Sequence, residues 1–132
     1  MNLAFSRDVV PLMFFPMMGQ DNNGNSWGFD RFDDIWAGVF SKKVMDHLGW
    51  SVINGSPQVE HKKASLTKHN LEKEKSGIEM NELLWKAIDE VQLTRNTAVE
   101  CYRELAEKVV FPKNEYFDKL KRAMIIWAEL FR

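Results

Sequence analysis

The sequence is short of the features that would place it in several broad classes of protein. Its 132 residues contain one cysteine, Cys101, so no internal disulfide can form, and a reducing, intracellular setting fits. The formal net charge is −1, without the excess of Lys and Arg expected of a nucleic-acid-binding surface. An apolar run over Val9–Met18 contains two prolines and is too short to span a bilayer. We therefore expect a cytoplasmic protein with no membrane span and no nucleic-acid partner.

Familiar catalytic and ligand-binding motifs are also missing. The sequence contains neither of the standard Gly-rich phosphate-binding loops. Its three histidines, His47, His61 and His69, include no pair four residues apart of the kind that binds zinc on a helix. Cys101 lies in a helical apolar pattern with no histidine nearby in the sequence, so we interpret it as a buried core residue.

The residues that are present suffice for one domain with one core. Apolar residues make up 45% of the chain and aromatic residues 12%, which is enough to bury an interior. Apolar side chains recur at steps of three and four residues, which predicts helices. These patterns cover Arg31–Gly49, Ile78–Leu93, Val99–Val109 and Phe117–Phe131.

Shorter stretches predict strands. Leu3–Phe5 and Trp50–Ile53 are apolar and rich in strand-forming residues, and Asn54-Gly55 after the second predicts a tight turn. Pro57 limits the residues through Val59 to an edge or irregular strand. Together with a short helical segment before Pro11, these patterns predict one α+β domain over residues 1–132, dominated by four to five helices.

The helix predicted over Arg31–Gly49 begins with two adjacent carboxylates, Asp33 and Asp34. A carboxylate near a helix N-terminus is favoured by the partial positive charge there, so one interpretation of the pair is purely structural. Clustered carboxylates can instead bind a divalent cation or act as a general base. A turn-rich run, Gln20–Gly28, leads into this helix start.

A second candidate segment is Glu60–Lys75, which is polar and rich in lysine. It reads either as a solvated loop with a short helix or as a basic patch for a phosphate-bearing ligand, with Lys62 and Lys63 as candidate contacts. Lysines alone do not distinguish these two interpretations.

Several separated blocks of the sequence resemble one family, in the same order and with the same spacing. The chain is similar to the C-terminal half of the reversibly glycosylated polypeptides, the UDP-arabinopyranose mutase family. The blocks that carry the resemblance are Met1–Phe5, Arg7-Asp8, Arg31–Gly38, Asp46–Gly49, Lys63–Ser65, Lys73-Glu74, Cys101-Tyr102, Tyr116-Phe117 and Ala123-Met124.

The resemblance implies a GT-A-like glycosyltransferase domain that binds a UDP-sugar and a divalent cation, Mn²⁺ or Mg²⁺. It implies that Asp33 and Asp34 face the reacting sugar as catalytic residues, that His61 completes the metal site, and that Lys62 and Lys63 lie near the diphosphate. Two departures lie beside this implied site: the Gln20–Gly28 loop is longer and richer in Asn, and Glu60 replaces an aromatic residue.

The resemblance also implies that the family's nucleotide-binding half would precede Met1. A chain without it would expose apolar surface that the missing half covers, and such surface drives association. We therefore expect a protein that is not catalytically competent alone and that forms a homo-oligomer or binds a complementing N-terminal half. The alternative function is a non-catalytic helical assembly domain.

Overall fold

The computed structural model describes the backbone of residues 3–29, 31–56 and 67–131, and their side chains outside 67–73 and 76. Within these ranges the chain forms a short 3₁₀-helix followed by four α-helices. They are η1 (Arg7–Leu12), α1 (Asp33–His47), α2 (Thr67–Asp89), α3 (Ala98–Lys108) and α4 (Glu115–Glu129). No helix within these ranges is long and apolar enough to cross a membrane.

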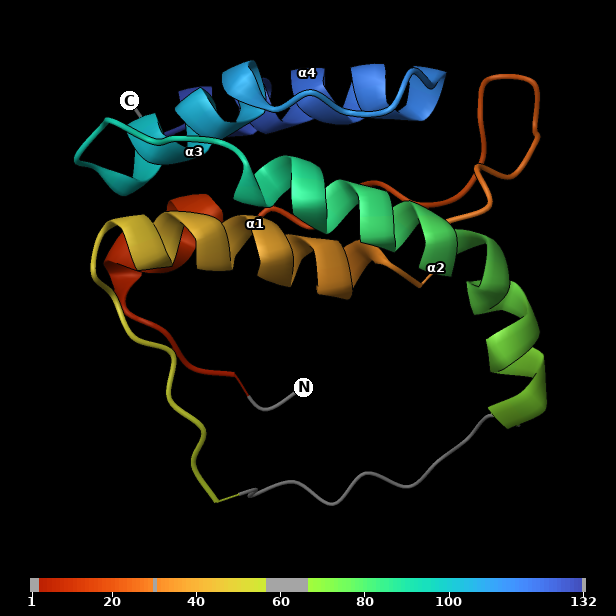
Figure 1. The fold of residues 1–132 in the computed structure, drawn as a ribbon, viewed down its shortest axis with the longest axis horizontal. Helices are drawn as coiled ribbons and strands as arrows, with labels where there is room; N and C mark the ends of the chain where they lie inside the picture. The colour runs from red at the N-terminus through yellow and green to blue at the C-terminus, as the bar shows by residue number, and fades with distance from the viewer. Residues whose placement is uncertain (1–2, 30, 57–66, 132) are drawn as a thin grey trace.

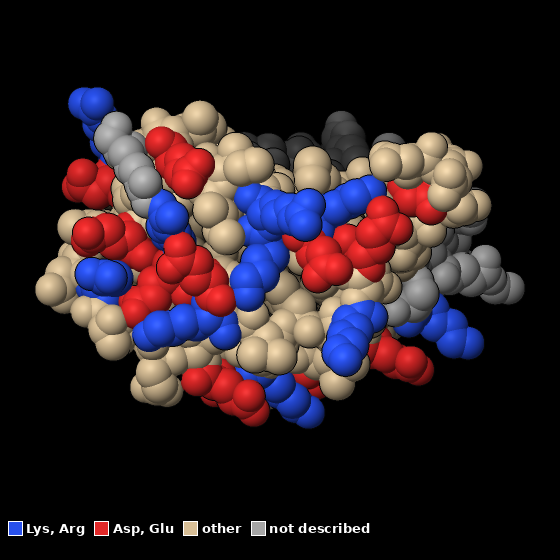
Figure 2. All heavy atoms as spheres, turned by 90° about the horizontal axis from the view of Figure 1, so that it is seen from above, with Lys and Arg blue, Asp and Glu red and all other residues tan. Residues whose placement is uncertain are grey.

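Helix α3 lies at the centre of the packing. It contacts α4, α1 and η1, and α2 packs against α1. Figure 1 shows α1 and α2 running side by side, with α3 and α4 stacked on them. Acidic and basic side chains are interspersed over the α3 and α4 side of the molecule in Figure 2, in keeping with the near-zero net charge.

The core forms because the helical periodicity places large apolar residues on facing stripes. Tyr102 and Leu105 on α3 are fully buried, as are Trp36 and Phe40 on α1. The ring of Phe117 on α4 lies 5.9 Å from the ring of Trp36, centroid to centroid. Burial of side chains of this size is the main favourable contribution to folding.

Polar side chains and a glycine mark three of the helix ends in the structure. Asn114 Oδ1 accepts a hydrogen bond of 2.8 Å from the Tyr116 backbone N–H and begins α4. Thr97 Oγ1 accepts from the Glu100 N–H at 3.3 Å and begins α3. Gly49 follows the end of α1 with φ of 71°, a conformation that glycine adopts at little cost.

Two side-chain hydrogen bonds hold η1 against the helices. The Ser41 hydroxyl donates to the Leu12 carbonyl at 2.6 Å, and Trp127 Nε1 donates to the Pro11 carbonyl at 2.9 Å. The carbonyl groups at the end of a short helix have no partner within it, and these bonds satisfy two of them. Residues 7–12 are thereby fixed to both α1 and α4.

The prediction of short strands was wrong for the residues that the structure describes. Residues 3–6 and 50–56 are non-helical but pair with no strand in the described ranges, where the only bridge is the isolated pair Gln20 and Ser26. Residue composition favours a strand, yet a strand forms only when another backbone satisfies its N–H and C=O groups. The part of the third predicted strand from residue 57 to 59 lies outside the described residues.

Helix α2 is also longer than predicted. It begins at Thr67 and ends at Asp89, so it includes part of the lysine-rich segment Glu60–Lys75, for which a loop with a short helix was one of two interpretations. Figure 1 shows it bending along its length. The pair Ser76-Gly77 lies near its middle, and Gly/Ser pairs are a common cause of helix bends.

Candidate functional site

The two candidate catalytic carboxylates stand in the first turn of α1. Phe32 precedes the helix and supplies no side-chain cap, so Asp33 and Asp34 provide the negative charge at this N-terminus. Asp34 Oδ1 accepts a hydrogen bond of 2.8 Å from the Ile35 N–H. Arg31, two residues before the helix, has φ of 80°, a conformation rare outside glycine.

Contacts with α2 fix this entry turn. Arg31 Nε lies 2.7 Å from Glu74 Oε1, and Trp36 Nε1 donates to Asn81 Oδ1 at 3.1 Å. The ring of Phe32 lies so close to Gly77 that a side chain at position 77 would overlap it. Residues distant in the sequence therefore position the start of α1.

The adjacent carboxylates have different surroundings. Asp33 is half-buried, and its charge is one of two factors that raise the pKa of the Tyr116 hydroxyl, burial of the tyrosine being the larger. The Tyr116 hydroxyl is buried and has no hydrogen-bond partner among the residues that the structure describes. Asp34 is exposed and lines an apolar groove of about 300 Å³ beside α1, together with Leu3, Phe15 and Val52.

The other predicted site residues, His61, Lys62 and Lys63, lie outside the described residues. Within the described ranges no group of three or more His, Cys, Asp or Glu side chains is placed to hold a metal ion. Mg²⁺ and Mn²⁺ prefer oxygen ligands, and Mg²⁺ commonly takes one or two carboxylates, with water completing the shell. Asp33 and Asp34 therefore fit the chemistry of such a cation but do not form a complete protein site.

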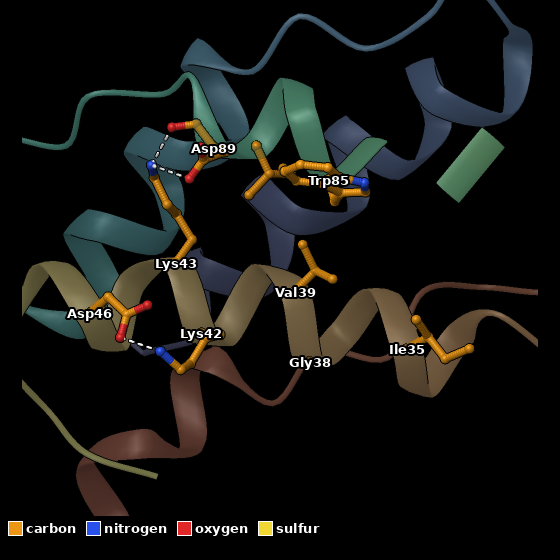
Figure 3. Close-up of a pocket in the computed structure, with 9 residues that line it drawn as sticks. Ile35, Gly38, Val39, Lys42, Lys43, Asp46, Trp85 and Asp89 are labelled. Atoms are coloured by element: carbon orange, nitrogen blue, oxygen red, sulfur yellow. Dashed lines mark hydrogen bonds and ion pairs between the residues drawn. The ribbon is translucent and has the colours of Figure 1, made fainter. Parts of the chain in front are cut away.

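The structure also contains a groove that the sequence interpretation missed, between α1 and α2. It has a volume of about 430 Å³, and its lining includes Ile35, Gly38, Lys42 and Trp85. In Figure 3 the Trp85 ring lies across the groove from α1, while Lys42 points toward Asp46 and Lys43 toward Asp89. No local sequence pattern indicates this groove, because its walls come from two helices that are distant in the sequence.

Two buried polar groups prove to be structural. Burial raises the pKa of the Cys101 thiol, which donates to the Arg95 carbonyl at 3.1 Å, so the thiol is poorly suited to act as a nucleophile. Glu104 is only 7% exposed and accepts hydrogen bonds from Thr94 and Arg95 and an ion pair from Lys108. It ties α3 to the connection that precedes it.

Comparison with known proteins decides the family. The family model described as "Reversibly glycosylated polypeptide" matches residues 1–132, the whole chain. This chain belongs to the reversibly glycosylated polypeptide family. The resemblance inferred from the sequence blocks is thereby confirmed.

Plant members of the family are similar over almost the whole of this chain. UDP-arabinopyranose mutase 1 of Arabidopsis thaliana is 42% identical over 135 residues, which cover 98% of this chain and 36% of the relative. UDP-arabinopyranose mutase 1 of Oryza sativa subsp. japonica is 39% identical with the same coverage. The chain thus spans about a third of the length of the curated relatives that it matches. No solved structure matches it.

Proposed function

We propose that this chain corresponds to the part of a UDP-arabinopyranose mutase-like protein that presents an acidic helix start to a sugar nucleotide. The observation that carries the proposal is the family match over all 132 residues, in a chain whose Asp33 and Asp34 lie together in the first turn of α1. The chain spans 36% of its relatives, so we do not expect it to be catalytically competent alone.

In this proposal Asp33 and Asp34 contact the reacting sugar or a Mn²⁺ or Mg²⁺ ion. His61 would complete the metal site, and Lys62 and Lys63 would neutralise the diphosphate. Together with the other two thirds of a full-length relative, this chain would form a GT-A-like domain. The protein would be located in the cytoplasm. The hard-cation chemistry of paired carboxylates supports this assignment.

Binding of a UDP-sugar in the presence of Mn²⁺ tests the proposal. We expect calorimetry to detect binding by this chain, alone or mixed with the N-terminal part of a full-length relative. A variant with both Asp33→Asn and Asp34→Asn should bind the UDP-sugar at least tenfold more weakly, since both substitutions replace a negatively charged carboxylate by a neutral amide, which binds the cation less well. Asp118→Asn, in the first turn of α4, is the matched control. Absence of binding in both preparations would refute the proposal.

A second candidate function, a non-catalytic assembly domain, is favoured by the surface around α1. Leu3, Phe15, Val52 and Ile53 are between 44% and 88% exposed, and the first three line the groove that contains Asp34. Apolar side chains gathered in this way mark binding surfaces. This function predicts a homo-oligomer by light scattering at micromolar concentration, and a monomer would refute it.

A further inference from the structure

The hydroxyl of Tyr116 is a buried polar group that the fold itself does not use. The residue is 3% exposed, and its hydroxyl has no hydrogen-bond partner among the described residues. A buried hydroxyl without a partner costs stability, and phenylalanine at the same position would avoid that cost. Such a group therefore calls for an explanation other than stability.

Contacts between aromatic rings place Tyr116 beside the start of α1. Tyr116 stands in the first turn of α4, where its backbone N–H donates to the Asn114 cap. Its ring lies 5.1 Å from the ring of Phe29 and 6.0 Å from the ring of Trp36, centroid to centroid. Phe29 precedes α1 and Trp36 lies one turn into it. The ring of Tyr116 therefore packs against the entry to α1.

Asp33 lies in the sequence between these two contacts and on the same side of α1 as Trp36, because residues three apart on a helix are neighbours. It is half-buried, whereas Asp34 is exposed. Burial and, to a smaller extent, the charge of Asp33 raise the pKa of the Tyr116 hydroxyl, so this carboxylate acts on the hydroxyl electrostatically. Among the described residues, an O–H donor thus lies near a carboxylate without a hydrogen bond to it.

Tyr102 on α3 provides a comparison. Its hydroxyl is also buried and has no partner among the described residues. Burial raises the pKa of Tyr102 too, but no charged group contributes to that shift. The two tyrosines therefore share burial and chemistry and differ in the carboxylate that acts on Tyr116.

We propose that Tyr116 is a positioning residue of the candidate site, whose hydroxyl donates a hydrogen bond to the Asp33 carboxylate when a sugar nucleotide and its cation bind there. A hydrogen bond from an O–H group to a carboxylate is among the stronger kinds in proteins. Groups that bond to a metal-ligating carboxylate fix its orientation. One oxygen of Asp33 then accepts from Tyr116, and the other faces the ligand.

This inference rests on the sugar-nucleotide function proposed above and gives each of the adjacent carboxylates its own support. Asp34 Oδ1 already accepts a hydrogen bond from the Ile35 N–H. Tyr116 supplies the corresponding donor for Asp33, from a different helix. Helix α4 thereby influences ligand binding, although none of the site residues predicted from the sequence lies on it.

Tyr116→Phe tests the proposal because it removes only the hydroxyl. Calorimetry measures UDP-sugar binding in the presence of Mn²⁺, by this chain alone or mixed with the N-terminal part of a full-length relative. We expect the dissociation constant to rise about tenfold. The midpoint of urea denaturation should stay the same or rise, since an unpartnered hydroxyl is removed. Tyr102→Phe, the matched control, should leave the dissociation constant unchanged.

Two double variants test whether the hydroxyl acts through Asp33. In an Asp33→Ala chain, adding Tyr116→Phe should change the dissociation constant by less than about twofold, because the acceptor is already absent. In an Asp34→Ala chain, the same addition should still raise the dissociation constant about tenfold. A hydroxyl with a purely structural role would not distinguish these two backgrounds.

The possible results separate this inference from the proposed function. Weaker binding by Tyr116→Phe, with normal binding by Tyr102→Phe and no loss of stability, supports the role of Tyr116. Wild-type binding that Tyr116→Phe leaves unchanged refutes that role and leaves the proposed function standing. Equal effects of Tyr116→Phe in the Asp33→Ala and Asp34→Ala chains also refute it. Absence of wild-type binding in both preparations refutes both proposals.

Discussion

The two sides of α1 differ sharply in what covers them. On the inner side Trp36, Phe40 and Val44 are fully buried against the other helices. On the outer side Ile35 remains 48% exposed beside Asp34 and Gly38. One side of α1 is therefore packed in the core and the other side is exposed to solvent. Only the exposed side is available for binding.

Truncation of an inner residue should produce the largest loss of stability. We expect Phe40→Ala to lower the free energy of unfolding by about 3–5 kcal/mol, since it removes a fully buried ring and leaves a cavity. Ile35→Ala on the exposed side is the control and should cost less than about 1 kcal/mol. Urea denaturation of both variants measures the difference, and equal losses would contradict the assignment of inner and outer sides.

The buried carboxylate of Glu104 should contribute pH-dependent stability. Burial alone would raise its pKa, but hydrogen bonds from Lys108, Thr94 and Arg95 outweigh that effect and lower the pKa to about 2. Because the folded pKa lies below the usual 4.5, the stabilisation is full above about pH 4.5 and is lost as the pH falls toward 2.

Glu104→Gln isolates this contribution. At pH 7 the substitution should reduce the free energy of unfolding by about 2–3 kcal/mol, which is the order expected for a shift of this size. The difference in free energy of unfolding between wild type and Glu104→Gln should become smaller as the pH falls from 4.5 to 2. Urea denaturation across this pH range provides the measurement, and a deficit that does not change with pH would show that the carboxylate charge is not what stabilises the fold.

Gly77 in α2 lies against a buried side chain, whereas Gly38 in α1 faces open space. The same substitution at the two glycines should therefore have different effects on stability. Gly77→Ala should destabilise by about 1–3 kcal/mol, because its Cβ would overlap the buried Phe32 ring. Gly38→Ala should be neutral or stabilising by up to about 1 kcal/mol, since open space surrounds Gly38. Thermal denaturation at a concentration where the chain is monomeric compares them. Equal effects would mean that Phe32 does not pack against α2 as described.

The sequence predicts the inner side of α1 much better than the outer side. Helical periodicity places Trp36, Phe40 and Val44 on one apolar stripe, and all three are buried in the core. Ile35 fits the same periodicity, but it is 48% exposed. Periodicity gives the direction in which a side chain points and not whether another element lies there. The absence of strands among the described residues has the same origin, since residues 50–53 form a strand only if a second strand is present.

The candidate site was predictable only in part. The position of Asp33 and Asp34 in the first turn of α1 follows from the sequence, and the structure confirms it. The groove lined by Trp85 depends on the packing of α2 against α1, which no local pattern encodes. The roles of Asp33, Asp34, His61, Lys62 and Lys63 stay predictions.

Calorimetry of UDP-sugar binding in the presence of Mn²⁺ is the most direct test of the claim that the start of α1 faces a sugar nucleotide. The account predicts binding by this chain, alone or mixed with the N-terminal part of a full-length relative, and a dissociation constant at least tenfold higher when Asp33→Asn and Asp34→Asn are combined. Binding that the double substitution leaves unchanged would contradict the account.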